Sequence, residues 1–250
     1  MRCGGSFEGT RKLAPLLSGA EQEHRVLFGR RRGRPLRPRQ RLLKEELLPR
    51  LAITLPACGA LDPQALFPSA ARPVWLEIGF GGGEHLATQA ASHLQVGFIG
   101  VEVFDNGIAK LVADIAQQHL ANIRIFADDA RLLLARLPPR SIDRTFILFP
   151  DPWPKRRHWK RRIIAPAILD RLAMVMAEGA ELRLATDDRG YLAWILQHLT
   201  EHPDFEWLAR RPADWREHPP DWPPTRYEEK ARAAGRAPVF LRAKRRVQTG

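Results

Sequence analysis

A glycine-rich turn follows the first strongly apolar run of the chain. Residues 74–80 (VWLEIGF) lead into Gly79, Gly81 and Gly83, and Glu77 stands just before them. Glycines at alternate positions let the backbone turn sharply and approach a ligand closely. A dinucleotide fingerprint would need Gly or Ala at position 84, but Glu84 stands there and would repel a pyrophosphate at the helix N-terminus. The turn predicts a ligand site and argues against NAD and FAD, with a ligand-free tight turn as the alternative.

Two acids follow the next two apolar runs. Glu102 comes roughly 20 residues after the glycines, where a carboxylate can accept hydrogen bonds from both hydroxyls of a ribose. Asp129 follows the third run and either contacts an adenine or caps the next helix. The sequence Asp-Ala-Arg-Leu-Leu-Leu from position 129 favours the cap.

A proline-bracketed acid precedes the most basic segment beyond residue 50. Asp151 lies between Pro150 and Pro152, which fix φ on both sides and remove two backbone donors, as suits a loop that holds a reacting residue. Six of the eight residues from Lys155 to Arg162 are Lys or Arg, and Trp159 lies among them. Cations of this kind contact phosphates and an aromatic ring can stack on an unpaired base, so the run predicts RNA contact. A solvated charge run, with Trp159 as a core anchor, is the alternative.

Two further motifs lie later in the chain. Asp187 follows the fifth apolar run and is expected across the same rim from Asp151. Thr225-Arg226-Tyr227-Glu228 follows a Pro-rich stretch and has the form of a helix N-cap with acids in the first turn.

The elements that must position these residues alternate between short apolar runs and helical stretches. Such alternation predicts βαβ units and a parallel sheet covered on both faces. We expect strands at 74–80, 98–103, 122–127, 141–149 and 181–186, with two more candidates at 205–211 and 238–245. We expect helices at 84–94, 104–120, 129–137, 161–177 and 191–199, the fourth ended by Gly179, and an irregular loop over 217–229. The fold class is α/β: a doubly wound, mostly parallel sheet with helices on both faces.

The N-terminal part differs from this pattern. Residues 1–24 are expected to be a flexible tail, 25–70 a basic extension with a short helix over 41–53, and 71–250 the main domain. Seven arginines occur from Arg30 to Arg41, where Pro35 and Pro38 are expected to prevent a helix. This arm either contacts phosphate or is simply solvated.

Charge and cysteine usage narrow the function classes. The 250 residues carry a net charge of +12, which favours a polyanionic partner, with nucleic acid ahead of an anionic membrane. Only two cysteines occur, so a disulfide scaffold and a cysteine zinc finger are excluded, and a reducing cytoplasm is expected. No apolar run is long enough to span a membrane and the N-terminus has no signal-peptide pattern. No metal site is expected.

Together these motifs resemble the bacterial tRNA (guanine-N7)-methyltransferases, within the class I S-adenosylmethionine (SAM) methyltransferases. The similarity covers about residues 25–245, and its most specific part is Pro150-Asp151-Pro152-Trp153-Pro154-Lys155 with the basic run. Two departures occur: the late motif is usually Thr-Lys-Phe-Glu, and Phe240-Leu241 stands where Asp-Leu is common.

The resemblance implies an enzyme that methylates N7 of guanine 46 in the tRNA variable loop, with SAM as cofactor. It implies no protein partner, and it leaves monomer and homodimer open. Asp151 would be the catalytic residue. The implied cofactor-binding residues are Glu77, Gly79, Gly81, Gly83, Glu102, Asp129 and Asp151. The implied substrate-binding residues are Lys155, Asp187, Thr225, Arg226, Tyr227 and Glu228. The implied RNA contacts are Arg157, His158, Trp159, Lys160, Arg161 and Arg162.

Three other functions stay open at this point. An amino-group methyltransferase also carries an Asp/Asn-Pro-Pro-aromatic loop, but the order here is Asp-Pro-Trp. An NAD-dependent oxidoreductase would need the missing third glycine. A non-enzymatic RNA-binding protein would explain the charge but not the glycine turn with Glu102.

Overall fold

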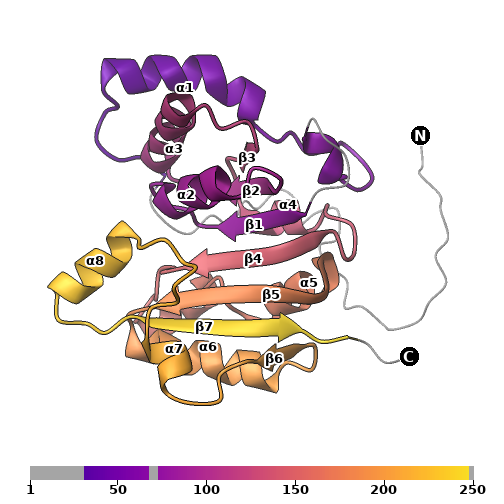
Figure 1. Cartoon of the computed structure of the whole chain (residues 1–250), viewed down its shortest axis with the longest axis vertical. Coiled ribbons are helices and arrows are strands. Elements are labelled where there is room, and N and C mark those ends of the chain that lie inside the picture. The colour runs from indigo at the N-terminus through magenta and orange to yellow at the C-terminus, as the bar shows by residue number, and fades with distance from the viewer. Residues whose placement is uncertain (1–30, 68–72, 248–250) are drawn as a thin grey trace.

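The computed structural model describes residues 31–67 and 73–247. Its centre is a seven-stranded sheet with the strand order β3-β2-β1-β4-β5-β7-β6 (Figure 1). The strands β1 to β5 pair in parallel, and β7 runs antiparallel to both β5 and β6. The strands are β1 (Val74–Ile78), β2 (Gly97–Val101), β3 (Ile123–Phe126), β4 (Ile142–Leu148), β5 (Met176–Thr186), β6 (Phe205–Trp207) and β7 (Val239–Arg245). The predicted α/β fold class is confirmed.

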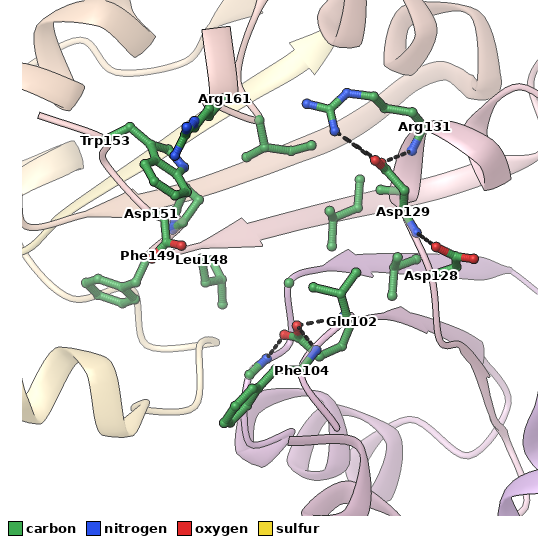
Figure 2. A pocket seen from close by; sticks show the side chains of 18 of the residues that line it. Glu102, Phe104, Asp128, Asp129, Arg131, Leu148, Phe149, Asp151, Trp153 and Arg161 are labelled. Atoms are coloured by element: carbon green, nitrogen blue, oxygen red, sulfur yellow. Dashed lines mark hydrogen bonds and ion pairs between the residues drawn. The ribbon is translucent and has the colours of Figure 1, made fainter. Parts of the chain in front are cut away.

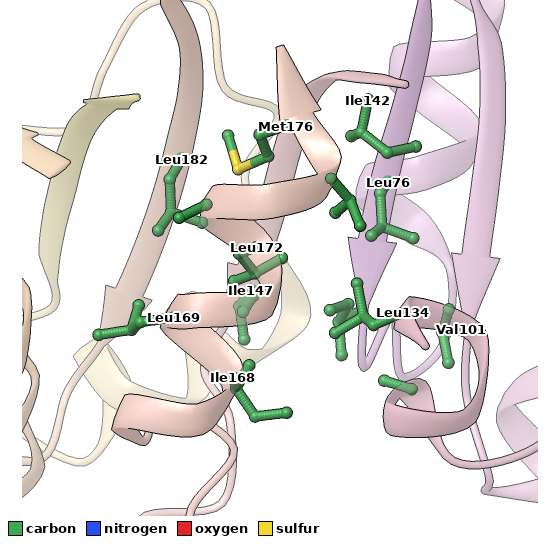
Figure 3. Close-up of a cluster of buried hydrophobic side chains, with 14 of the residues drawn as sticks. Leu76, Val101, Leu134, Ile142, Ile147, Ile168, Leu169, Leu172, Met176 and Leu182 are labelled. Carbon is green, nitrogen blue, oxygen red and sulfur yellow. The ribbon is translucent and has the colours of Figure 1, made fainter. Parts of the chain in front are cut away.

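Helices cover both faces of the sheet because neighbouring residues of each strand point to opposite sides. On β1, Trp75 packs with α2 (Glu84–Ser92) and α3 (Asp105–Gln118), whereas Leu76 packs on the other face. That other face is covered by α4 (Ala130–Leu134), α5 (Pro166–Val175) and α6 (Arg189–Glu201). Figure 3 shows Ile168, Leu169 and Leu172 of α5 packed against the strands.

The described part of the basic extension is built into the fold. Helix α1 (Pro38–Leu51) packs Leu43, Leu47, Leu48 and Leu51 against the core beside α3. Just after it, Ile53 donates its N–H to the Ile125 carbonyl at 2.8 Å. The prediction that Pro38 prevents a helix is wrong, because Pro38 occupies the first helical turn, where no N–H is needed. Arg30 and the predicted tail 1–24 lie outside the described residues.

The predicted helix over 161–177 is too long at both ends. Pro166 begins α5, and Met176 already belongs to β5, where it pairs with Ile142. Gly179, expected to end the helix, instead lies inside β5 with φ 80°, near the register shift between Ile142 and Arg144. Sheet pairing therefore converts a stretch with helical pattern into strand.

Two short helices close the C-terminal region. They are α7 (Ala213–Arg216) and α8 (Arg226–Ala233), and α8 begins inside the stretch predicted as irregular loop. Thr225 accepts a hydrogen bond from the Glu228 N–H at 3.1 Å, which confirms the helix N-cap.

Truncation of Leu172 tests the packing of α5. Leu172 is fully buried, so Leu172→Ala should lower the free energy of unfolding by about 2–5 kcal/mol. Leu94→Ala is the matched control, because Leu94 is 68% exposed and its loss should change stability by less than about 0.5 kcal/mol. Urea denaturation of both variants gives the comparison, and equal losses would contradict the packing of α5.

Candidate active site

A cavity of about 380 Å³ opens where strands β1, β2 and β4 end. Its apolar floor comes from the last residues of these strands, Ile78, Val101 and Leu148. The strand order reverses between β1 and β4, and ligands of doubly wound sheets bind at such a crevice. Figure 2 shows Glu102 and Asp129 on the side of β2 and β3, with Asp151, Trp153 and Arg161 across from them.

The glycine turn forms one wall of this cavity. Gly79 and Gly81 both line it, with φ of 75° and 57°, conformations that side chains with a Cβ rarely adopt. A Cβ on Gly81 would also lie 2.8 Å from the Tyr227 ring. A Cβ on Gly107, in α3, would overlap the Gly81 carbonyl oxygen. The turn is therefore held between two close neighbours.

Glu102 connects the glycine turn to the start of α3. Its carboxylate accepts the N–H of Gly81 at 2.8 Å, of Val103 at 2.7 Å and of Phe104 at 2.9 Å (Figure 2). Burial raises the pKa of Glu102 above 4.5, and the charge of Asp151 adds to the rise. A carboxylate has about four acceptor positions, so three bonds leave roughly one for a ligand hydroxyl.

Two residues predicted to bind cofactor lie away from the cavity. Glu77 is 3% exposed and pairs with His85 Nδ1 at 2.7 Å. Gly83 is the N-cap of α2 and packs on Leu111. Glu77 lies just before the glycine turn and Gly83 at its end, and neither residue lines the cavity. Their predicted cofactor contacts stay predictions.

Asp129 caps α4, and its position on the cavity wall also leaves the predicted contact with an adenine possible. It lines the cavity, and it caps α4 by accepting the Arg131 N–H at 2.9 Å. The Arg131 guanidinium also pairs with it, at 3.1 Å. The preceding Asp128 accepts the Asp129 N–H at 2.9 Å and lines the same cavity.

The loop after β4 brings Asp151 to the opposite wall. Phe149 and Trp153 on either side of it adopt φ of 50° and 43°, which is strained backbone for residues other than glycine. Arg161 lies over the Trp153 ring at 4.9 Å, and both line the cavity. Asp151 and Glu102 line the same cavity, and their charges interact.

The basic run forms a short 3-10 helix over Arg156–Arg161, and its members differ sharply in exposure. Lys155, Arg157 and Lys160 are exposed, as an RNA contact requires. The pKa of His158 is lowered by desolvation and by the surrounding cations Arg161, Arg157 and Lys155.

Two members of the run face inward. The Trp159 ring packs against the Trp194 ring at a centroid distance of 5.4 Å. This contact fits the alternative in which Trp159 anchors the run to the core. Arg162 is 3% exposed and departs from the predicted RNA contact, because its guanidinium is enclosed by protein.

The later motifs approach the cavity unequally. Tyr227 lines it, and its ring lies against Gly81. Asp187 pairs with Arg236 at 2.6 Å and does not line the cavity.

The other members of the Thr225–Glu228 motif are held by contacts outside the cavity. Glu228 is buried and pairs with Arg232 at 2.9 Å and with His218 at 3.2 Å. Arg226 lies 4.0 Å from Glu84. Thr225 and Glu228 thus hold α8, and Tyr227 is the member that reaches the site.

Sequence reasoning missed several residues that line the cavity. Phe104, Asp128, Arg131 and Phe149 all do so. Each lies within two residues of a predicted site residue, so the neighbours of each motif were the available signal. Ile163 also lines the cavity, and the pattern had assigned it to a helix interior.

Comparison with known proteins decides the family. The family model described as putative methyltransferase matches residues 71–241. The tRNA (guanine-N(7)-)-methyltransferase of Rhodospirillum rubrum is 52% identical over 224 residues, covering 88% of this chain and 87% of the relative. That of Rhizobium meliloti is 48% identical over 220 residues, covering 88% and 95%. The chain belongs to the tRNA (guanine-N7)-methyltransferase family.

The solved structures agree on the fold. The crystal structure of the 16S rRNA methyltransferase KamB matches with a TM-score of 0.50 and 16% identity, over 74% of this chain and 91% of that one. Membership in a methyltransferase family removes the oxidoreductase and the non-enzymatic alternatives.

The described residues contain neither a membrane-spanning helix nor a cluster of metal ligands. No helix there is both long enough and apolar enough to cross a membrane. Across 31–67 and 73–247, no group of His, Cys, Asp and Glu side chains is arranged to hold a metal ion.

The raised pKa of Glu102 predicts a pH effect on cofactor binding. As pH falls, this carboxyl takes up its proton at a higher pH than an ordinary glutamate and loses acceptor strength. SAM affinity should therefore begin to fall at a higher pH than it would with a glutamate of ordinary pKa in this place. Glu102→Gln should bind SAM about 1.5–3 kcal/mol more weakly at pH 7 and should lack this pH dependence. Calorimetry from pH 7 downward tests this, and parallel profiles for both proteins would remove Glu102 from the site.

Proposed function

We propose that this protein transfers the methyl group of SAM to N7 of guanine 46 in the tRNA variable loop, giving 7-methylguanosine. The observation that carries the proposal is the identity of about 50% to tRNA (guanine-N(7)-)-methyltransferases over most of the chain. We place the reaction in the cytoplasm, where tRNA is found. The proposal involves no second protein, since this chain's own residues supply both walls of the cavity.

The residues around the cavity fit SAM. The ligand carries an electrophilic methyl group on a sulfonium and has no phosphate, so nearby carboxylates suit it. Gly79 leaves room beside the backbone, and the apolar residues Ile78, Val101 and Leu148 suit an adenine ring. Glu102 offers a remaining acceptor position to a ribose hydroxyl, and Asp129 lies beside it on the cavity wall.

The acceptor atom needs no base. Guanine N7 carries a lone pair and no proton, so it can take the methyl group directly, with loss of the methyl–sulfur bond and release of a neutral thioether. Methylation leaves the base cationic, and a carboxylate held nearby stabilises the charge as it develops. We assign this electrostatic and orienting role to Asp151, whose loop already has the strained conformation that presents it to the cavity.

Three further groups are assigned to substrate recognition: Asp187, Tyr227 and the exposed cations of the basic run. Arg236 donates to one oxygen of Asp187, so the other oxygen is the one proposed to accept from guanine N1–H and the exocyclic amine. Tyr227 is proposed to contact the base at the cavity mouth. The exposed cations Lys155, Arg157 and Lys160 are proposed to contact tRNA phosphates.

The direct test uses unmodified tRNA and methyl-labelled SAM. Digestion to nucleosides should place the label in 7-methylguanosine, and a tRNA with adenine at position 46 is the matched control. Label in an exocyclic amine would favour the amino-group methyltransferase and overturn the proposal. Equal labelling of the position-46 control would overturn only the assigned position.

Asp151→Asn removes the charge and keeps the shape. We expect the single-turnover rate of methyl transfer to fall by a factor on the order of 10²–10³ because one preorganised electrostatic group is lost. SAM and tRNA affinities should change less than the rate.

The wild-type rate should stay level from pH 6 to 8, since no proton leaves in methyl transfer. A tenfold rise in rate per pH unit that disappears in Asp151→Asn would show base catalysis instead.

The double variant Arg157→Ala/Lys160→Ala tests the RNA contact. If each side chain contacts one phosphate, the slope of log affinity against log salt should fall by about 1.4–1.8, using the single-strand and duplex coefficients. SAM affinity should stay the same, because neither residue lines the cavity. An unaltered salt slope would identify the run as a solvated surface.

A further inference from the structure

Arg162 is enclosed by aromatic rings. Its guanidinium carbon lies 4.8 Å from the centre of the Trp159 ring and 4.9 Å from those of Tyr191 and Trp194. Its residue is 3% exposed, whereas Arg156, Arg157 and Lys160 of the same run are exposed. A side chain in this position cannot reach a phosphate on the surface. The structure therefore separates Arg162 from the RNA-facing cations.

Arg162 holds the loop that carries Asp151. Its Nε donates a hydrogen bond of 2.8 Å to the carbonyl of Pro152, the residue immediately after Asp151. Three of the five residues from Pro150 to Pro154 are prolines and have no N–H to donate. The loop therefore depends on donors from elsewhere, and Arg162 supplies one at its centre.

The strain in this loop makes such a donor valuable. Phe149 and Trp153 both have positive φ, a backbone conformation that is unfavourable for residues other than glycine. Conformations of this kind persist only where surrounding contacts over-determine them. The Phe149 N–H is bonded to the Ala185 carbonyl at 2.8 Å, which fixes the start of the loop. The bond from Arg162 to Pro152 fixes its middle.

The ring enclosure is itself anchored beside Asp187. Tyr191 and Trp194 lie on α6, which begins just after Asp187 and Asp188. Trp194 Nε1 donates to the Ile164 carbonyl at 2.6 Å, and the Tyr191 hydroxyl accepts the Ile164 N–H at 3.1 Å. The segment that carries Arg162 is thus tied to the helix that follows β5. One scaffold places both acids assigned to the reaction.

The chemistry of the guanidinium suits this place and an ammonium does not. A planar guanidinium can stack on rings while donating Nε–H within its plane, and it is more weakly hydrated than an ammonium. Burial lowers the pKa of Arg162, with Tyr191 and Asp188 opposing the shift. Burying a cation is costly unless it is hydrogen-bonded, so the bond to Pro152 and the surrounding rings are what hold this guanidinium in place.

We propose that Arg162 is a positioning residue, which fixes the Asp151 loop through the Pro152 carbonyl and makes no contact with RNA. This inference rests on the proposed function, since Asp151 is assigned its role there. It predicts that loss of the guanidinium slows methyl transfer and leaves tRNA affinity and its salt dependence intact.

The experiment compares Arg162→Lys with two other variants. The single-turnover rate at saturating tRNA and SAM should fall at least tenfold in Arg162→Lys, because small misplacement of a reacting group costs up to about 10²-fold. The salt slope of tRNA binding should equal that of wild type. Arg157→Ala should instead lower the slope by about 0.7–0.9. Arg189→Lys, the same exchange at an exposed position of α6, should keep the wild-type rate and slope.

A double-mutant cycle separates positioning from general damage. In the Asp151→Asn background, Arg162→Lys should lower the rate much less than in wild type, because the group that it positions is already disabled. Equal losses in both backgrounds would overturn the proposal. A wild-type rate with a lowered salt slope would also overturn it and make Arg162 an RNA contact.

A second variant covers the case in which lysine prevents folding. Trp194→Phe keeps a ring beside Arg162 but removes the donor to Ile164. Its rate should fall with an unaltered salt slope, and a wild-type rate would overturn the proposal. If the wild-type protein itself puts no methyl group on tRNA guanine N7, the proposed function fails, and that result is distinct from any of these.

Discussion

The carboxylate of Glu102 is the interaction on which the arrangement of the site depends. It accepts N–H groups from the glycine turn after β1 and from the segment that leads into α3. Gly107 then lets α3 approach so closely that any side chain at that position would overlap the Gly81 carbonyl. A half-buried acid that accepts three backbone N–H groups therefore holds these two segments on one side of the cavity.

The opposite wall of the cavity, formed by the loop after β4, is held by side-chain contacts from arginines instead of by a carboxylate. The loop from Phe149 to Lys155 is rich in proline and strained, so its shape comes from outside contacts. Arg162 supplies one such contact from within its ring enclosure, and Arg161 supplies another by lying over Trp153. Two neighbouring arginines of the basic run thus contact this loop, one from the cavity wall and one from a buried position, while Lys155, Arg157 and Lys160 are exposed.

The C-terminal segment reaches the site through a third set of contacts. Arg183, fully buried under the sheet face, pairs with Asp221 at 2.6 Å, and Gln89 donates to the Asp221 carbonyl at 3.1 Å. Trp222 is buried beside Phe240. The Pro-rich stretch is therefore docked on the sheet, and α8 follows with Tyr227 against Gly81. A buried arginine on β5 thus helps to fix the segment that leads to Tyr227 on the cavity wall.

Local pattern by itself determined the strands of the sheet, the helices between them and the position of the glycine turn and of Asp151. Burial on both faces requires short apolar runs, and a ligand site at their carboxyl ends requires glycine and acid residues just after them. Those signals are local, so they can be read from neighbouring residues. The resemblance to a family also rested on such local motifs.

Tertiary structure alone decided which members of each motif line the cavity and which are buried or exposed. The basic run reads as uniform, yet Arg162 is buried and Arg157 exposed, because rings from α6 lie on one side of it. Thr225–Glu228 reads as one motif, yet only Tyr227 of the four lines the cavity. Met176 leaves a helical pattern to pair with Ile142. In each case the deciding partner lies far away in sequence, and contacts of that kind leave no local pattern.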